Sequence, residues 1–236
     1  MSDKLETKDE QKDDAKRWLD ALRIAGKNQH DWEAKSEKIE KRYKDERTEA
    51  ENQTKRYNIL WSNVETLKPA VYARTPKPVV LRRFKDRDSL GLQASRVLER
   101  ALEFSVDAYD FDDVMNSVVE DRLLSGRGIA RVIYDPTMGK AEGSDGQEYE
   151  EVAYEQVLCE YIHYKDFRHG TARQWEQVPW VAFRTFPTKD ELRKRFGKKA
   201  ENISLNYKPE GCEDDDEQFK KAKVWEIWSK TDAMIY

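Results

Sequence analysis

The sequence predicts an α+β fold in which charged N-terminal helices and a helical pair precede an antiparallel or mixed sheet with one short capped helix. Three observations lead to this prediction. Apolar residues recur at helical spacing over much of residues 1–124, strand-like runs begin near residue 129, and glycine or proline separates the segments. We expect two parts, a charged helical extension over residues 1–56 and an α+β domain over residues 57–236.

The composition narrows the class of protein. Charged residues make up 38% of the 236 residues, against about 25% in an average globular protein, which predicts much solvated or interfacial surface. The net charge of -4 gives no long-range attraction for nucleic acid. The two cysteines, Cys159 and Cys212, stand in unlike contexts, and no apolar run reaches the roughly 18 residues of a membrane span. We expect a protein made in the cytoplasm, with no membrane segment.

Residues 1–56 contain 30 charged residues, which indicates exposed helices. A short apolar stripe begins at Trp18, and Gly26 with Asn28 predicts the end of a first helix before a second begins. A seven-residue apolar register extends over residues 32–71, although polar residues interrupt it and residues 52–54 predict a break. The register leaves two interpretations open, a coiled coil and a surface helix that packs on its own domain.

Residues 57–80 combine an amphipathic helix with a proline-spaced segment. Leu60, Val64, Leu67 and Val71 fall on one helical face, which we expect to be buried. Pro69 cannot donate to the preceding turn, so a kink is expected, and prolines 76 and 78 impose extended backbone afterwards.

Residues 90–124 predict two helices joined by a tight corner, and Asp110 and Asp113 mark the start of the second helix. Ser125–Gly128 should end the second helix, because glycine adopts the left-handed cap conformation. Residues 129–134 read as a buried strand, and the glycines at positions 139, 143 and 146 mark a polar hairpin tip.

The C-terminal half is expected to supply the sheet. Residues 148–164 and 178–186 read as strands, residues 223–228 and 233–236 as the arms of a hairpin, and residues 206–218 as a solvated acidic loop. Thr188 and Glu191 form a capping box for a short helix that ends at Gly197. Because the last arm stops abruptly, we expect the chain to continue in a longer protein.

Two clusters could suggest catalysis or a metal. Cys159, His163 and His169 lack a fourth ligand at comparable spacing, so packing on a strand surface is the preferred interpretation. Five carboxylates could gather a divalent metal for a nuclease, but helix capping explains two of them, and the adjacent pair points in different directions. The five are Asp110, Asp112, Asp113, Glu120 and Asp121. We therefore predict no catalytic residue, no metal site and no cofactor.

One local basic cluster follows the extended segment. It comprises Arg82, Arg83, Lys85 and Arg87. Such residues pair with acidic groups of a neighbouring subunit or contact phosphates. In a chain of balanced charge, the first role is preferred.

Several blocks of the sequence together resemble the portal proteins of short-tailed bacteriophages. The blocks are residues 57–80, 111–135, 164–167, 188–197 and 224–228, and their order over about three quarters of the chain carries the resemblance. The family-like motif residues are Asn58, Leu60, Trp61, Asn63, Pro69, Pro76, Pro78, Gly126, Gly128, Trp225 and Trp228.

The resemblance implies a structural subunit, not an enzyme. It implies the wing-like part of a ring, a dodecamer in the full-length form, at one capsid vertex of the virion. DNA would pass through the ring during packaging and ejection, and the missing continuation would carry the DNA-facing stem. The implied partners are other copies of the chain, the terminase motor, the capsid and scaffold, tail adaptor proteins and double-stranded DNA. The alternatives are a coiled-coil adaptor protein and a metal-dependent nuclease.

Overall fold

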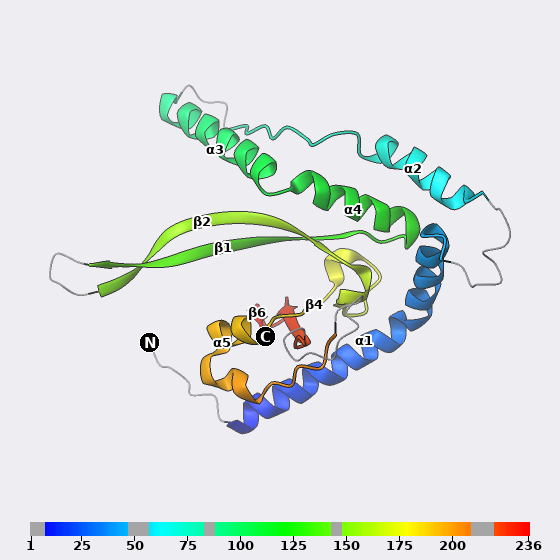
Figure 1. Ribbon diagram of the computed structural model, residues 1–236. Coiled ribbons are helices and arrows are strands. Elements are labelled where there is room, and N and C mark those ends of the chain that lie inside the picture. The colour runs from blue at the N-terminus through cyan, green and yellow to red at the C-terminus, as the bar shows by residue number, and fades with distance from the viewer. Residues whose placement is uncertain (1–7, 47–56, 83–87, 143–147, 209–219) are drawn as a thin grey trace. The chain divides into compact units, whose positions relative to one another are not determined.

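The computed structural model describes residues 8–46, 57–82, 88–142, 148–208 and 220–236 (Figure 1). These residues form five α-helices and two antiparallel sheets, which confirms the predicted α+β class. They divide into two compact units, Met1–Ala34 with Lys165–Tyr236 as unit 1 and Lys35–Tyr164 as unit 2. The expected boundary between residues 56 and 57 lies at the edge of a segment outside the described residues.

Helix α1 (Lys8–Tyr43) is continuous and contributes to both units. The predicted helix end at Gly26 and Asn28 is therefore wrong. Ala25 is buried, and a Cβ on Gly26 would lie 3.7 Å from Arg168 Nε, which is an ordinary packing contact, so this part of the helix packs on a neighbouring element. Burial of this helical face outweighs the cost of about 1 kcal/mol that glycine imposes on a helix.

The seven-residue register over residues 32–71 does not follow one helix. Helix α1 ends at Tyr43, Asp45 adopts a left-handed conformation with φ 56°, and α2 (Ile59–Val71) begins after a new cap at Asn58. The coiled-coil interpretation needs one continuous helix, and the structure does not provide it, because a positive φ at Asp45 and a new cap at Asn58 separate α1 from α2. The predicted break at residues 52–54 lies outside the described residues.

Unit 2 contains three further helices after α1. Helix α2 continues through Pro69, and residues 75–82 then form neither helix nor strand, as the prolines predicted. Helices α3 (Ser89–Ala108) and α4 (Phe111–Leu124) confirm the predicted pair. Asp110 makes the corner with φ 52° and no side-chain cap bond, so it turns the chain through its backbone alone.

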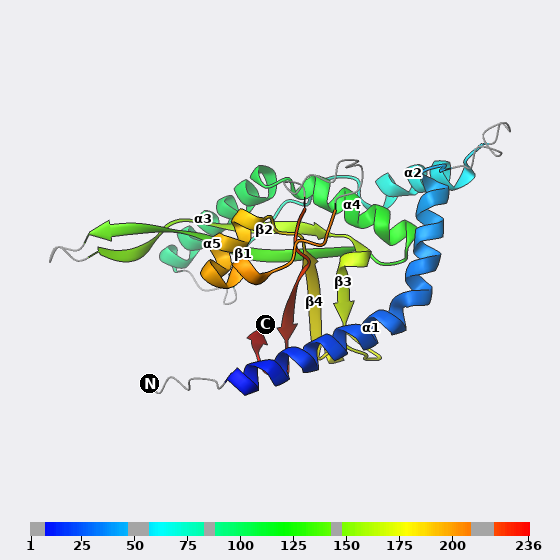
Figure 2. The same cartoon turned by 60° about the horizontal axis from the view of Figure 1, so that its bottom comes forward.

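A long hairpin completes unit 2 (Figure 2). Strands β1 (Ile129–Glu142) and β2 (Glu148–Ile162) pair antiparallel, with an irregularity in register between Thr137 and Met138. Residue 139 is paired within β1, so the strand extends beyond the predicted tip. The predicted burial of residues 129–134 is also wrong, because Val132 is 64% exposed. A two-stranded ribbon cannot cover its own faces.

Unit 1 contains a four-stranded sheet in the order β3-β4-β5-β6. Its strands are β3 (Phe167–His169), β4 (Trp180–Thr185), β5 (Val224–Ser229) and β6 (Met234–Ile235), with short 3-10 turns at Tyr164–Asp166 and Trp175–Gln177. The predicted strand near residues 178–186 and the C-terminal hairpin are confirmed. Trp18 of α1 packs with Ala182 and Ile227 in the core of this unit.

Helix α5 (Lys189–Phe196) follows the sheet's second strand and precedes a 3-10 helix (Gly197–Asn202). Both bonds of the predicted capping box are present between Thr188 and Glu191. Leu192 is buried with Ala200 and Ala222, so α5 closes a second small core. No helix in the described ranges has the length and apolar character that crossing a lipid bilayer requires.

Candidate assembly surface

Helix α3 exposes the apolar face that its sequence encodes. Asp88 fixes the start of the helix, since its two carboxylate oxygens accept from the backbone N–H groups of Leu90 and Gly91 at 3.1 and 3.0 Å. No residue of α3 is buried, and Val97 and Leu98 are 68% and 51% exposed. A contiguous exposed apolar face of this kind is typical of interaction sites.

The hairpin supplies a second exposed apolar wall. Val132 lies opposite Cys159 and Tyr134 lies opposite Val157, so these cross-strand pairs share one face. Tyr134 and Val157 are both at least half exposed. β1 and β2 have no third strand beside them among the described residues, so within unit 2 the hairpin is packed by α3 and α4.

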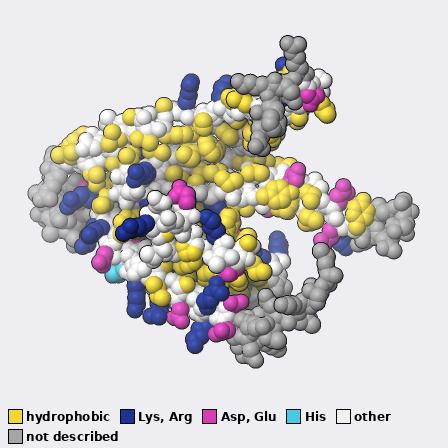
Figure 3. Space-filling model, turned by 180° about the vertical axis from the view of Figure 1, so that it is seen from behind, with side chains coloured by type: hydrophobic (Ala, Val, Ile, Leu, Met, Phe, Trp, Pro, Cys, Tyr) yellow, Lys and Arg dark blue, Asp and Glu magenta, His cyan; other side chains and the backbone are white. Residues whose placement is uncertain are grey.

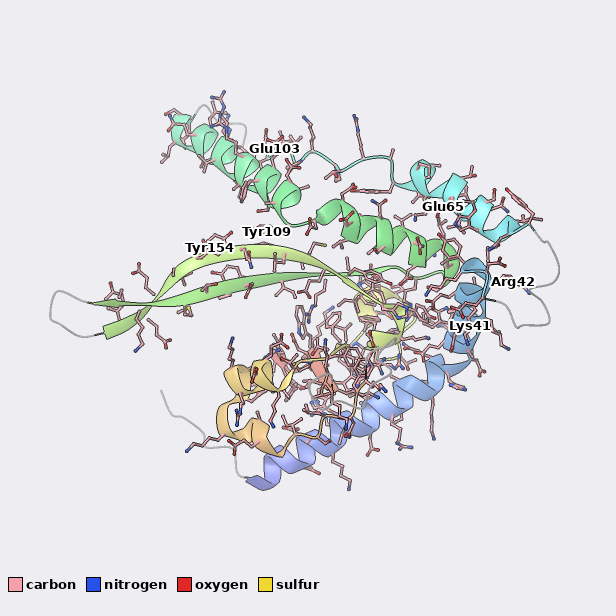
Figure 4. The ribbon with its side chains drawn as sticks, viewed as in Figure 1. Lys41, Arg42, Glu65, Glu103, Tyr109 and Tyr154 are labelled. Carbon is pink, nitrogen blue, oxygen red and sulfur yellow. The ribbon has the colours of Figure 1, made fainter. Side chains whose placement is uncertain are left out.

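Between these walls lies a cavity of about 580 Å³, which we call the α3–hairpin groove. Tyr109, at the C-terminal end of α3, and Tyr154 of β2 share a hydroxyl hydrogen bond that joins the walls (Figure 4). The groove is lined by Leu98, Ala101, Leu102, Phe104, Ser105, Val106, Tyr109, Phe111, Val132, Tyr134 and residues 154–159. Its lining is almost entirely apolar or aromatic, which suits a protein segment better than a polar small molecule.

Acidic residues accompany the apolar wall of the hairpin. Strands β1 and β2 together hold seven Asp or Glu and two Lys or Arg. Figure 3 shows hydrophobic and acidic side chains side by side on this arm of the molecule. A partner for the groove therefore needs an apolar surface that carries positive charge.

A polar network links three of the helices of unit 2. Lys68 of α2 donates to Glu120 of α4 at 2.7 Å, and this bond raises the pKa of the Lys68 ammonium group. Tyr43, the last residue of α1, donates to Glu65 at 2.6 Å and lowers the pKa of that carboxyl. The network thus ties α1, α2 and α4 together.

The buried carboxylate of Asp121 connects α4 to β2. Tyr161 donates to it at 2.7 Å. Burial raises the pKa of the Asp121 carboxyl, and the Tyr161 hydroxyl and the nearby His163 oppose that rise, whereas Glu40 and Glu120 add to it. A buried carboxylate that depends on one tyrosine hydroxyl makes this contact sensitive to substitution.

Replacing Tyr161 with phenylalanine is expected to lower the free energy of unfolding by about 2 kcal/mol near neutral pH, because the Asp121 carboxylate stays buried without its donor. A carboxyl whose pKa is raised by folding destabilises the folded state above that pKa, and the penalty disappears as the pH falls through it. The loss should therefore shrink as the pH is lowered from neutral and the Asp121 carboxyl becomes protonated. Urea unfolding, followed by tryptophan fluorescence, measures both effects.

Asp121→Asn is the matched control, because asparagine still accepts from Tyr161 but carries no charge. In an Asp121→Asn background, Tyr161→Phe should cost less and should show little dependence on pH. An equal loss at neutral and at lower pH in the two backgrounds would contradict the role assigned to the carboxylate.

The predicted basic cluster is only partly described. Arg82 donates to the backbone carbonyl of Asp88 at 3.0 Å, and thereby supports the capping residue of α3. Arg83, Lys85 and Arg87 lie outside the described residues.

The family-like motif residues fall on caps, turns and strands and do not converge on one site. Asn58 accepts from the Trp61 N–H and donates to the carbonyls of Arg42 and Tyr43, so it links α1 and α2. Leu60, Asn63 and Pro69 lie within α2, and Pro76 and Pro78 lie in the extended segment. Gly126 and Gly128 form the turn into β1, and Trp225 and Trp228 belong to β5.

The face expected to be buried on α2 is only partly covered. Val64 is buried, but Leu67 is 49% exposed and Val71 is 59% exposed. Helix α2 is bonded to α4 through Lys68 and Glu120, but the part of its apolar face at Leu67 and Val71 is left uncovered. This helix adds a second exposed apolar surface to unit 2.

The candidate metal and nuclease residues are not brought together in the described part of the chain, where no group of three or more potential ligands is found. Glu120 accepts from Lys68, whereas the adjacent Asp121 accepts from Tyr161, so the two carboxylates point apart. Asp112 instead accepts from Thr75 at 3.0 Å.

Sequence reasoning missed the groove itself. The apolar spacing of α3 and the alternation in β2 are visible in the sequence, but both patterns are also typical of buried elements. The high charge content was the available signal, since it left few apolar residues to cover these faces.

Comparison with known proteins adds no relative. No model of a protein family matches the chain, and no curated protein has a similar sequence.

Proposed function

We propose that the chain is a structural subunit of a phage portal ring, which admits DNA to the capsid and connects the head to the tail. The family assignment comes from the sequence resemblance. The observation that carries the proposal is the α3–hairpin groove, whose two walls are apolar and exposed within one chain. Large exposed apolar faces are typical of subunits that are stable only with a neighbour in place.

The exposed surfaces of unit 2 are consistent with this role. In a ring, each subunit contacts its two neighbours through two different surfaces, and these two surfaces must be complementary. Exposed apolar residues on α2 and on the extended segment lie apart from the groove, so one unit offers more than one surface to neighbours. A mildly acidic chain also limits attraction to phosphates, which lets DNA move through a channel with little friction.

In this proposal the protein resides at one capsid vertex of the virion and binds further copies of itself. The terminase motor, the capsid and scaffold, and the tail adaptor are its other partners, and double-stranded DNA passes through without sequence recognition. The chain has no catalytic role in it.

Electron microscopy of the purified chain tests the proposal. We expect end-on views of closed rings with rotational symmetry and a central opening wide enough for a DNA duplex, about 20 Å across. Particles that show no ring at concentrations of tens of micromolar would contradict it. Cleavage of DNA in the presence of magnesium or manganese, lost on Asp113→Ala, would favour the nuclease instead.

A further inference from the structure

The extended segment between α2 and α3 presents a basic apolar ridge. Alternate side chains point outward along residues 78–82, and Val79 and Leu81 are 71% and 84% exposed. The backbone N–H of Val80 donates to Glu99 of α3 at 3.1 Å, and this bond fixes the segment to that helix. We call Val79 and Leu81 the ridge.

Positive charge surrounds the ridge. Residues 74–82 contain three Lys or Arg, at positions 74, 77 and 82, and no Asp or Glu. Arg74 and Lys77 are exposed. Pro76 and Pro78 also restrict the backbone, so the segment loses little conformational freedom when it is bound.

The α3–hairpin groove has the complementary properties. It is apolar and lined by aromatic residues, and its hairpin wall carries seven acidic residues against two basic ones. Proline-spaced extended segments bind such aromatic-lined grooves, and basic residues at their ends pair with acidic groups on the rim. The apolar residues of the ridge match the apolar lining of the groove. The basic residues beside the ridge are opposite in charge to the acidic hairpin wall.

A chain cannot place the ridge in its own groove. The bond from the Val80 N–H to Glu99 fixes the segment to one side of α3. Leu98, which lines the groove, is the neighbouring residue and projects about 100° away from Glu99 around the helix axis. The two surfaces therefore meet only between different copies of the chain.

We propose that the ridge of one copy occupies the α3–hairpin groove of the next copy. The contact joins two different surfaces, so every bound copy still offers a ridge and a groove, and the assembly grows head to tail until it closes. This inference rests on the proposed ring function and names the surfaces that build the ring.

The test uses two variants, each of which removes one surface. Val79→Asp with Leu81→Asp removes the ridge, and Leu98→Gln with Leu102→Gln removes the apolar lining of the groove. These residues are all exposed in the single chain, so the substitutions leave its core intact. Ile24→Asp, at a position 52% exposed on α1, is the matched control. Circular dichroism confirms that each variant retains its helices.

Native mass spectrometry is expected to show single copies for each variant alone and the wild-type assembly for Ile24→Asp. An equimolar mixture of the two variants should give a one-to-one dimer that grows no further, because only one intact ridge–groove pair remains. Retention of the wild-type assembly by either variant would overturn the inference and leave the proposed ring function standing. Variants that dissociate but form no mixed dimer would also overturn it. A wild-type chain that is monomeric would overturn both proposals.

A charge exchange tests the same contact without replacing an apolar residue, although Glu155→Lys also removes the acceptor of the Tyr134 hydroxyl. Lys77→Glu and Glu155→Lys each place like charges across the contact, so each should weaken association by about tenfold or more. The double variant restores an attractive pair and should recover most of that loss. Recovery that is absent in the double variant would show that these two side chains do not face each other.

Discussion

Replacement of Gly128 with alanine is expected to lower the free energy of unfolding by about 3 kcal/mol or more. Gly128 lies in the turn from α4 to β1, where the backbone of α4 passes unusually close. A Cβ at this position would lie 2.0 Å from the backbone oxygen of Val118 and 2.8 Å from a methyl carbon of its side chain. The backbone oxygen cannot rotate away, so α4 or the hairpin must shift. Chemical denaturation measures the loss.

Gly126 provides the matched control two residues away. It adopts φ +81°, but a Cβ there would meet no atom within 4 Å. Gly126→Ala should therefore cost only the backbone strain of a left-handed alanine, about 1 to 2 kcal/mol. Equal losses of stability for the two variants would contradict the close approach of the α4 backbone at Val118 to Gly128.

Truncation of Glu33 to alanine is expected to cost about 3 kcal/mol of unfolding free energy. Arg168 of β3 forms a two-pronged ion pair with Glu33 of α1, in which Nη2 lies 3.3 Å from Oε2. Both side chains are mostly buried, at 12% and 18% exposure. Without Glu33 the guanidinium stays in a low-dielectric site, and its remaining acceptors among the described residues are Gln29 and the backbone carbonyl of Phe167.

The exposed pair of Lys41 and Glu37 on the same helix is the control. Its side chains are 57% and 44% exposed, so Glu37→Ala should cost about 0.5 kcal/mol or less. Arg168→Met combined with Glu33→Leu should recover much of the loss seen for Glu33→Ala, because it removes the stranded charge. A loss for Glu33→Ala as small as that for Glu37→Ala would contradict the role of this pair in fixing α1 to the sheet.

Local signals in the sequence predicted most of the elements. The capping box at Thr188, the corner at Asp110 and the left-handed turn at Gly126 each depend on a few neighbouring residues, and all three are present. The long return strand was predicted from the alternation of apolar residues in residues 148–164. Such features can be predicted from the sequence because short-range sterics and hydrogen bonds between neighbouring residues determine them.

Features that depend on distant residues were not predictable. Gly26 reads as a helix end, but packing of α1 near Arg168, more than a hundred positions away, keeps the helix continuous. The apolar register over residues 32–71 left a coiled coil open, whereas the cap at Asn58 starts a separate helix. Periodicity reports which face is apolar and does not report whether the chain itself covers that face.

The candidate site illustrates the same limit. The apolar residues of α3 and the hairpin were recognised as faces, but their exposure follows from how few elements pack on them in unit 2. The basic cluster from Arg82 to Arg87 was expected to pair with acids of another subunit, and because residues 83–87 lie outside the described part of the chain, this stays a prediction. The portal family itself remains a proposal from the sequence blocks.

The native mass of the wild-type chain over a range of micromolar concentrations tests the central claim most directly, that this is a ring-forming subunit. The account predicts one closed assembly of about a dozen copies, whose copy number does not increase as the concentration rises. A single copy or a discrete dimer at every concentration would contradict it.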